Sequence, residues 1–249
     1  MIRKRKYPLG IAFGGGGARG YYHLGVLKRL LEMGHIPQIV SGTSVGAIVA
    51  AYYAQGFTVE EILQAFEHLT LKDFLWQKLS KEYLVDSKPL RKIFEETFRV
   101  QTFEELKVPV KIVATCLETA KEVVFESGPL AEAVLASCSI PVLFPPAEIN
   151  GKHYVDGGVM RNIPVTPIRN SCKRVYAINL FPEQGTDLAY NKSIRHIADR
   201  SISMLFRAGA KADLQRADLV IENKGMARFN AFDLKYKDEM YELGYNTVF

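Results

Sequence analysis

The most constraining feature of the sequence is a short apolar run that passes through glycine directly into a helical pattern, and it occurs twice near the start. The run Leu9–Phe13 ends in four glycines, Gly14–Gly17, after which leucines recur at helical spacing. The run Ile39–Ser41 passes through a single glycine toward Val45–Gln55, which is apolar nearly all round and is expected to be a buried helix. Strands that alternate with helices in this way favour a mostly parallel sheet covered on both faces.

The rest of the chain continues the alternation. The stretch between about residues 58 and 105 is mainly helical, with helix starts predicted at Thr58, Ser87 and Thr102, and Asn150-Gly151 suits a hairpin turn. Further strands are predicted at Val108–Leu117, Glu122–Glu126, His153–Val155, Lys173–Phe181 and Asp218–Glu222, and further helices at Leu130–Ser137, Ser193–Leu214 and Asp233–Tyr245. We therefore expect one α/β domain over residues 1–249, with a mainly helical excursion at about 58–105.

The charge balance leaves two interpretations open. The 249 residues carry a formal net charge of +5, which suits an anionic surface such as phospholipid headgroups or simply aids solubility. The sequence contains no recognisable nucleic-acid-binding module, so we expect no nucleic-acid partner. The three cysteines show neither close pairing nor a CxxC pattern, which argues against a disulfide framework or a zinc site and fits a reducing compartment.

No apolar run approaches the roughly 18 residues that a membrane-spanning helix needs. The basic start, Met1–Lys6, resembles the first region of a signal peptide, but the residues after it lack a proper hydrophobic segment. We therefore expect an intact cytosolic start and a cytoplasmic protein, with peripheral contact at a membrane left open.

A GxSxG pattern lies between the second predicted strand and the helix that follows it, in Gly42-Thr43-Ser44-Val45-Gly46. This is the context of a nucleophile elbow, in which a tight turn projects the serine hydroxyl above the sheet. Small flanking residues let the backbone crowd there, and the following helix N-terminus adds positive potential. The alternative is a plain strand-to-helix turn in which Ser44 helps to cap the helix.

The glycine run supports two competing functions, besides a purely structural turn. The amides of Gly15, Gly16 and Gly17 could form an oxyanion hole. Equally, Gly15, Gly17 and Gly20 satisfy the GxGxxG spacing of a dinucleotide site, which also needs an acidic residue near the end of the second strand. The chain has no Asp or Glu between Met33 and Val59, so we favour the oxyanion hole.

A serine nucleophile needs a base, and none of the five histidines stands in a recognisable triad context. His196 is the only late one, and it falls inside a predicted helix. Asp156 is the better candidate, because it follows a short predicted strand and precedes Gly157 and Gly158, which allow a sharp turn. Taken alone, an Asp-Gly-Gly sequence is most simply a turn.

Four blocks considered together resemble the patatin-like phospholipases, in particular the compact bacterial type. In family order, they are the glycine-rich block Gly15–Gly20, the elbow Gly42–Gly46, the proline-rich block Ala136–Pro141 with Phe144-Pro145-Pro146, and Asp156-Gly157-Gly158. The blocks span a little over half of the chain.

The resemblance implies a three-layer αβα sandwich and a Ser-Asp dyad in place of a triad. It carries the nucleophile onto Ser44, the base onto Asp156 and the oxyanion donors onto the amides of Gly15–Gly17, with Arg19 in the basic position of its block. The remaining motif residues carried over are Gly20, Gly42, Gly46, Gly157 and Gly158. The scheme requires no metal and no cofactor.

The function expected from these residues is acyl hydrolysis of lipid esters, of phospholipase or lysophospholipase type. One alternative is a non-catalytic or regulatory protein with the same fold, and a less favoured one is a nucleotide-binding α/β protein. The sequence leaves open the acyl chain, the headgroup, a neutral lipase or thioesterase activity, and the oligomeric state, a homodimer included. It also leaves open whether residues 66–84, with leucines at 71, 75 and 79, form a lid or a helix packed on the core.

Overall fold

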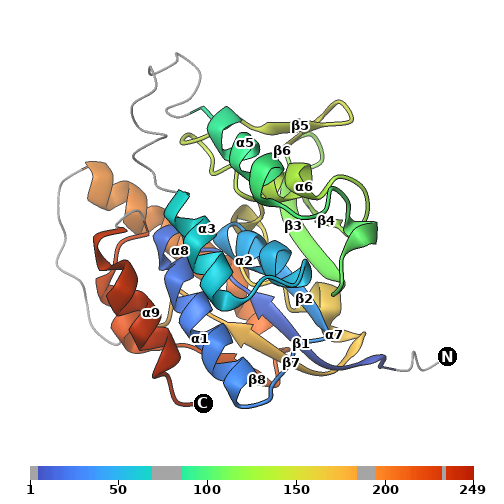
Figure 1. The fold of residues 1–249 in the computed structure, drawn as a ribbon. Coiled ribbons are helices and arrows are strands. Elements are labelled where there is room, and N and C mark those ends of the chain that lie inside the picture. Colours follow the sequence, from blue (N-terminus) through green and yellow to red (C-terminus); the bar gives the residue numbers. More distant parts are fainter. Residues whose placement is uncertain (1–4, 69–85, 184–193, 232–233) are drawn as a thin grey trace.

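The computed structural model describes residues 5–68, 86–183, 194–231 and 234–249 (Figure 1). The strands are β1 (Tyr7–Phe13), β2 (Ile39–Thr43), β3 (Val110–Cys116), β4 (Lys121–Phe125), β5 (Ala147–Ile149), β6 (Lys152–Asp156), β7 (Cys172–Ile178) and β8 (Leu219–Ile221). The α-helices are α1 (Gly20–Glu32), α2 (Val45–Ala54), α3 (Val59–His68), α5 (Lys88–Thr97), α6 (Leu130–Ser137), α7 (Thr166–Arg169), α8 (Ile194–Leu214) and α9 (Lys237–Tyr245). Short 3-10 turns are η1 (Gly17–Arg19), η2 (Phe103–Glu105), η3 (Gly157–Val159), η4 (Lys224–Arg228) and η5 (Leu234–Tyr236).

The strands of the described residues form one sheet in the order β5-β6-β3-β2-β1-β7-β8, and β4 also pairs with β3. The central strands β3, β2, β1, β7 and β8 run parallel, whereas β4, β6 and β5 add antiparallel pairs at one side. The expected mostly parallel centre is therefore confirmed, with an antiparallel extension that the sequence patterns did not resolve.

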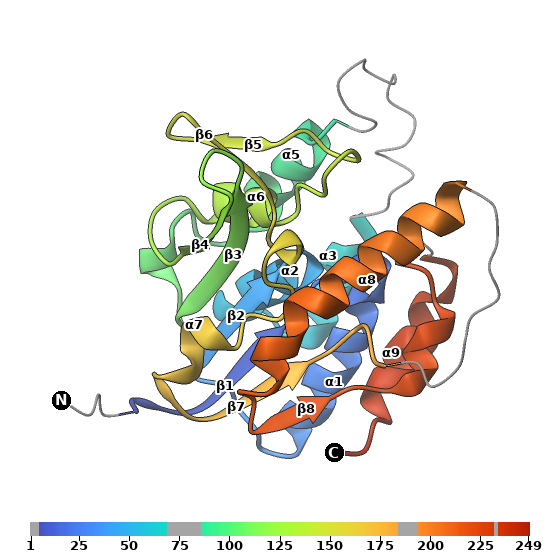
Figure 2. The same ribbon diagram turned by 180° about the vertical axis from the view of Figure 1, so that it is seen from behind.

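Alternating side chains of β1 explain the three layers. Leu9, Ile11 and Phe13 face the larger core, in which α1 and α2 pack on the sheet, whereas Ala12 faces a smaller core with side chains from α7 and α8. Helix α9 packs along α1 on the outside of the first layer. Figure 2 shows α7 and α8 on the opposite face, so the predicted three-layer αβα sandwich is confirmed.

Several local predictions differ from the structure. The strand predicted at Lys173–Phe181 ends at Ile178, and the helix predicted from Asp233 begins only at Lys237, after the turn η5. The helix start predicted at Thr102 is a single 3-10 turn, which keeps its capping box. The sequence reading missed α7, a one-turn helix, and did not assign β5. Most of the 66–84 stretch, leucines 71, 75 and 79 included, lies outside the described residues.

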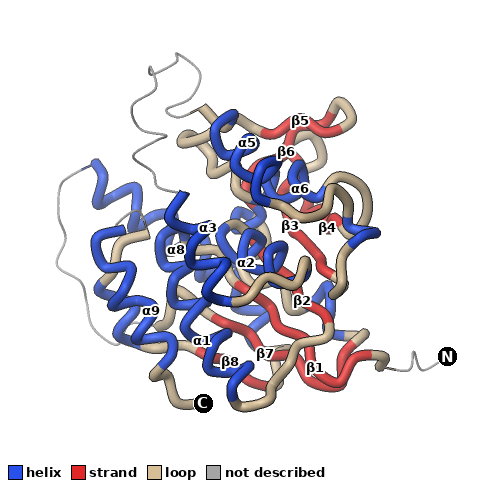
Figure 3. The backbone as a smooth tube through the Cα atoms, viewed as in Figure 1, coloured by secondary structure: helices blue, strands red, loops and turns tan. Residues whose placement is uncertain are grey.

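The region between α2 and β3 contains α3, α5 and η2 and, in its described part, no strand (Figure 3). Asn150 and Gly151 have φ values of 51° and 71°, as the predicted hairpin turn between β5 and β6 requires.

One edge of β3 is shared by two strands that meet end to end. Strand β2 pairs with residues up to Val113, opposite Thr43, and the antiparallel β6 pairs from Ala114 onward, opposite Asp156. Strand β4 occupies the other edge of these same β3 residues. The carboxyl end of β6 therefore arrives beside the carboxyl end of β2, which brings together two residues that lie 112 positions apart in the chain (44 to 156).

Candidate active site

Ser44 occupies the sharp turn between β2 and α2. Its φ of 56° and ψ of −128° lie outside the regions that a non-glycine residue readily adopts. Such strain costs of the order of 1–3 kcal/mol and persists only where the surroundings enforce it. Here the Ser44 carbonyl accepts hydrogen bonds from the amides of Ala47 and Ile48, at 2.8 and 3.2 Å, which ties the turn to the first turn of α2. The Ser44 side chain forms no capping hydrogen bond with α2, so its hydroxyl is not needed to hold the helix start.

The turn is possible because the chain approaches itself closely at Gly42 and Gly46. A Cβ added to Gly46 would lie 2.2 Å from the carbonyl oxygen of Phe13, and one on Gly42 would lie 2.2 Å from that of Gly46. Both distances are shorter than any contact a Cβ can make, so these glycines are required by close packing of backbone on backbone.

Asp156 ends β6 and is completely buried, as Ser44 nearly is. Its backbone amide donates to the carbonyl of Ser139 at 2.9 Å, and its side-chain Oδ1 accepts the amide of Gly158 at 2.7 Å. Its Oδ2 is buried and accepts no hydrogen bond from any residue that the structure describes.

Burial governs the electrostatics of this carboxyl group. Desolvation raises the pKa of Asp156 from 3.8 to about 7, while the nearby Ser44 hydroxyl and the Gly158 amide oppose the rise. The Ser44 hydroxyl acts from close by, although within the described chain it forms no hydrogen bond of ordinary geometry with Asp156. A carboxyl with a pKa near 7 is half ionised at neutral pH, so Oδ2 is an acceptor placed beside a serine hydroxyl.

The glycine loop lies next to Ser44. A Cβ on Gly15 would stand 3.1 Å from the Cβ of Ser44. The amide of Gly15 donates to the carbonyl of Asn162 at 3.1 Å, whereas the amides of Gly16 and Gly17 donate no hydrogen bond to the described residues. Gly17 has a φ of 58°, and a Cβ there would lie 2.2 Å from the carbonyl oxygen of Ala231, so a side chain is excluded.

Two side chains to which the sequence analysis assigned no role hold the Ser44 turn and the glycine loop in place. Ser137 accepts the amide of Ser44 at 2.9 Å and donates to the carbonyl of Val113 at 2.6 Å, which fixes the nucleophile turn to β3. Asn162 is fully buried and spans from the Asp156 loop to the glycine loop through Gly15. Ser137 stands in the proline-rich block already singled out, whereas no pattern in the sequence marked Asn162.

The remaining motif residues serve the framework. Gly20 packs on Val45, Gly157 on the carbonyl of Val113, and Gly158 on the ring of Phe206 in α8. Arg19 points away from the serine: it is buried, donates to the carbonyls of Phe229 and Leu180, and stacks over the ring of Phe181 at 4.3 Å. It fastens the C-terminal part of the chain beneath the glycine loop.

A partly buried cluster of three charged side chains braces the loop after Asp156. Arg161 binds both Glu122 of β4 and Asp213 of α8, and Asp213 is almost fully buried. The carbonyl of Arg161 accepts the hydroxyl of Thr43, the residue before Ser44, at 3.0 Å. Arg161 thus connects the loop after Asp156 to β2, which leads into Ser44, and to the helix layer behind the sheet.

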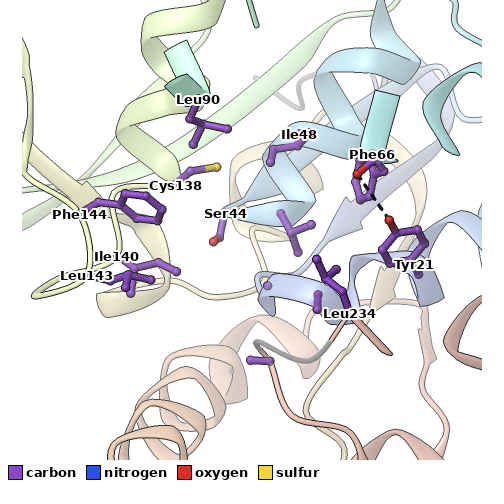
Figure 4. A pocket seen from close by; sticks show the side chains of 14 residues that line it. Tyr21, Ser44, Ile48, Phe66, Leu90, Cys138, Ile140, Leu143, Phe144 and Leu234 are labelled. Atoms are coloured by element: carbon purple, nitrogen blue, oxygen red, sulfur yellow. Dashed lines mark hydrogen bonds between the residues drawn. The ribbon is translucent and has the colours of Figure 1, made fainter. Parts of the chain in front are cut away.

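A cavity of about 120 Å³ opens at Ser44 (Figure 4). Its lining is almost entirely apolar and comes from the glycine loop, α1, α2, α3, α5, the segment after α6 and the C-terminal region. Figure 4 shows Ser44 between Phe144, Ile140 and Leu143 on one side and Phe66 and Tyr21 on the other. The lining residues are Gly17, Ala18, Tyr21, Ser44, Val45, Ile48, Phe66, Leu90, Cys138, Ile140, Leu143, Phe144, Ala231 and Leu234.

The histidines whose side chains are described lie away from this cavity. His23 is buried behind the glycine loop, where Nε2 donates to the carbonyl of Gly14 at 2.7 Å. Burial lowers its pKa from 6.5 to about 4, so it is neutral at pH 7. His35 packs against Tyr176, and His153 pairs with Glu118 on the surface. The side chains of His68 and His196 are outside the description.

Comparison with known proteins identifies the family. The model of the patatin-like phospholipase family matches residues 11–168, more than half of the chain, and includes both Ser44 and Asp156. The chain therefore belongs to the patatin-like phospholipase family.

Several proteins are similar to this chain in sequence, among them a mycobacterial and a yeast protein. An uncharacterised NTE family protein of Mycobacterium tuberculosis is 33% identical over 161 residues, which are 64% of this chain and 44% of that protein. The lysophospholipase NTE1 of Kluyveromyces lactis is 30% identical over 195 residues, which are 75% of this chain and 14% of the yeast protein. The chain thus spans less than half the length of these two relatives.

Among solved structures, VipD from Legionella pneumophila has a similar fold, with a TM-score of 0.62. The match covers 97% of this chain and 66% of VipD at 14% sequence identity, so it bears on the fold alone.

Among the described residues, no helix is long and apolar enough to cross a membrane. The same residues contain no group of three or more His, Cys, Asp or Glu side chains arranged to hold a metal ion.

Proposed function

We propose that this protein is a serine acyl hydrolase of lipid esters, of the phospholipase or lysophospholipase type, with Ser44 as nucleophile and Asp156 as general base. The observation that carries the proposal is the fully buried Asp156, whose Oδ2 accepts no hydrogen bond from the described residues and which lies beside a strained serine at the end of an apolar cavity.

Proton transfer would begin the reaction. Asp156 Oδ2 accepts the Ser44 proton as the serine oxygen attacks the ester carbonyl carbon. The protonated carboxyl then returns the proton to the alcohol or lysolipid as it leaves, and an acyl-enzyme remains. Water attacks the acyl-enzyme with Asp156 again as base, and this releases the fatty acid and restores both residues. The raised pKa suits this exchange, because a base near pH 7 both accepts and returns protons readily.

The negative charge of the tetrahedral intermediate requires donors. We assign this role to the amides of Gly16 and Gly17, because Gly15, the third expected donor, already gives its amide to Asn162. Each well-placed donor contributes roughly 3 kcal/mol to stabilising the transition state. The N-terminus of α2, which begins at Val45, adds positive potential at the same point.

The apolar lining supports a hydrocarbon substrate. Its side chains offer no charged partner to a substrate, so the cavity suits the acyl chain, while the headgroup remains toward solvent. The yeast relative is named a lysophospholipase, and that name supports the same substrate class.

A fluorophosphonate probe tests the nucleophile directly, because it forms a stable bond only with an activated serine. We expect covalent labelling of the wild type, none of Ser44→Ala, and much slower labelling of Asp156→Asn. The matched control is Ser41→Ala, which removes a buried serine hydroxyl three residues earlier, within β2, and should leave labelling intact.

The alternatives give different results in the same experiment. A folded wild type that neither labels nor hydrolyses a panel of lipid esters would support a non-catalytic protein of this fold. Binding of a nucleotide at the glycine loop, seen by titration and lost on Gly16→Ala, would support the nucleotide-binding alternative.

A further inference from the structure

Two residues after the end of α6, the chain forms a partly exposed loop without a polar side chain. Residues 140–146, Ile-Pro-Val-Leu-Phe-Pro-Pro, form this apolar loop. Surface loops are ordinarily rich in polar residues, and here Pro141 and Val142 are exposed, with 80% of the Val142 surface open to solvent.

Val142 stands in a conformation that disfavours valine. Its φ is 70°, in the left-handed region, where a β-branched side chain is strained and asparagine or glycine is more stable. The sequence thus places a strained and exposed hydrophobic side chain where a polar residue would stabilise the folded state. Strain that is retained in this way is typical of functional positions.

The apolar loop is connected to the site by its side chains and by backbone hydrogen bonds at its base. Its side chains Ile140, Leu143 and Phe144 line the cavity of Ser44 (Figure 4). The carbonyl of Ser139, directly before the loop, accepts the amide of Asp156, and the amide of Phe144 donates to the carbonyl of Ile140 at 2.9 Å. The base of the loop is therefore fixed, its inner side forms a wall of the cavity, and its tip projects away.

We propose that the tip of this loop, Pro141-Val142, inserts into the surface of a lipid layer and holds the mouth of the cavity against it. This inference rests on the proposed function. A substrate that resides in a lipid layer must pass its acyl chain into the cavity, and the transfer is least costly where apolar side chains continue from the cavity wall into the layer. The three prolines restrict the loop, so little conformational entropy is lost when it inserts.

A lipid surface fits the loop better than a protein groove does. The tip presents no hydrogen-bonding side chain that could match a polar rim, which protein interfaces usually have. The net charge of +5 also favours approach to lipid layers, whose surfaces are neutral or anionic.

The test separates docking from hydrolysis by means of vesicles made of diether phosphatidylcholine, which contains no ester bond. Flotation with these vesicles measures the partition of wild type, Val142→Asn and Val248→Asn. Val248 is the matched control, since it is a valine 96% exposed at the far end of the chain and outside the cavity lining. We expect Val142→Asn to reduce partition about tenfold or more, because the variant loses burial of one valine side chain. Val248→Asn should partition as wild type.

Hydrolysis of a water-soluble monomeric ester is measured for the same three proteins and should be equal, because Val142 does not line the cavity. Thermal unfolding shows whether the variant is folded; Asn suits a left-handed φ, so its midpoint should not fall. Equal partition of Val142→Asn and wild type, or absence of wild-type partition, would overturn the docking proposal even if the monomeric ester is hydrolysed. A dimer that Val142→Asn dissociates, without vesicle binding, would assign the tip to a second copy of this chain and likewise overturn it.

Discussion

Replacing Asp156 with asparagine should abolish ester hydrolysis and, at neutral pH, stabilise the folded protein. The carboxyl is completely buried, and its Oδ2 accepts no hydrogen bond from the described residues. Asparagine has the same shape, keeps Oδ1 as acceptor for the Gly158 amide and removes the charge. The variant therefore loses the proposed general base and, with it, the free-energy cost of a buried carboxylate.

The size of the effect follows from the pKa. Burial raises the pKa of Asp156 from 3.8 to about 7, a shift of about 3 units, and each unit corresponds to about 1.4 kcal/mol, or about 4 kcal/mol in all. Because the folded state binds the proton more tightly than the unfolded state, this carboxyl favours folding most below pH 4. Its contribution is lost as the pH rises from about 4 to about 7, whereas asparagine does not titrate.

Urea unfolding of both proteins at several pH values between 4 and 8.5 measures the difference. The free energy of unfolding of the variant minus that of wild type should increase by up to about 4 kcal/mol across the window from pH 4 to 7 and stay constant above it. Asp213→Asn is the matched control: this carboxylate is equally buried but paired with Arg161, so its removal should destabilise the protein. A stability difference between Asp156→Asn and wild type that is the same at pH 4 and pH 8 would refute the reasoning.

Three further predictions concern activity and packing. The kcat/KM of wild type for a monomeric ester should fall about tenfold per pH unit below pH 7 and level off above it, because Asp156 must be ionised in the free enzyme. A flat pH–rate profile between pH 5 and 8 would contradict this prediction. For esters of increasing acyl length, kcat/KM should rise about fourfold per methylene until the cavity is filled, because burying each methylene contributes about 0.8 kcal/mol. A series of esters that shows no rise would exclude the cavity as the acyl site. Gly46→Ala should unfold the elbow and abolish activity, because its Cβ would lie 2.2 Å from a carbonyl oxygen. The control Gly209→Ala in α8, whose Cβ would have no neighbour nearer than 3.5 Å, should keep activity and raise the unfolding midpoint slightly. Equal behaviour of the two variants in thermal unfolding would show that backbone crowding does not control the turn.

Local patterns in the sequence were sufficient for the parallel centre of the fold. The apolar runs of β1 and β2 are buried on both faces, and short turns lead from them into helices. A short continuous apolar run followed by glycine and then a helical pattern therefore identifies these strands. Strand β5 and helix α7 are only three and four residues long, too short for periodicity to develop, and they form because tertiary contacts hold them.

In the candidate site, too, one part is predicted by local sequence and another part depends on contacts between distant segments. Gly42, Ser44 and Gly46 act through a turn whose requirements are local, so a five-residue pattern predicts it. The approach of Asp156 depends on β6 pairing with the end of β3, which is a non-local contact that no window of sequence contains. The resemblance to a family supplied that partner, whereas chemistry alone left a turn as the simplest interpretation of Asp-Gly-Gly.

The residues that brace the site escaped prediction for a physical reason. Arg161, Asp213 and Glu122 are charged residues from a loop, a helix and an edge strand, and a charged residue in a sequence is most simply assigned to the surface. Only the fold reveals that Asp213 is buried against the guanidinium. Asn162 is likewise a single polar residue whose meaning depends on the glycine loop placed opposite it.

These bracing contacts explain how the fold tolerates a site that works against its own stability. Ser44 is strained, and Asp156 is a buried carboxyl with an oxygen that no described residue binds. Either feature would relax if the turn or the loop could shift by a small distance. The turn cannot shift, because Gly46 already lies against the Phe13 backbone and Ser137 holds the Ser44 amide. The Asp156 loop is tied through Arg161 to the layer behind the sheet. The proposed base therefore obtains a pKa near neutrality from burial, and rigidity of the surrounding backbone is the condition for that chemistry.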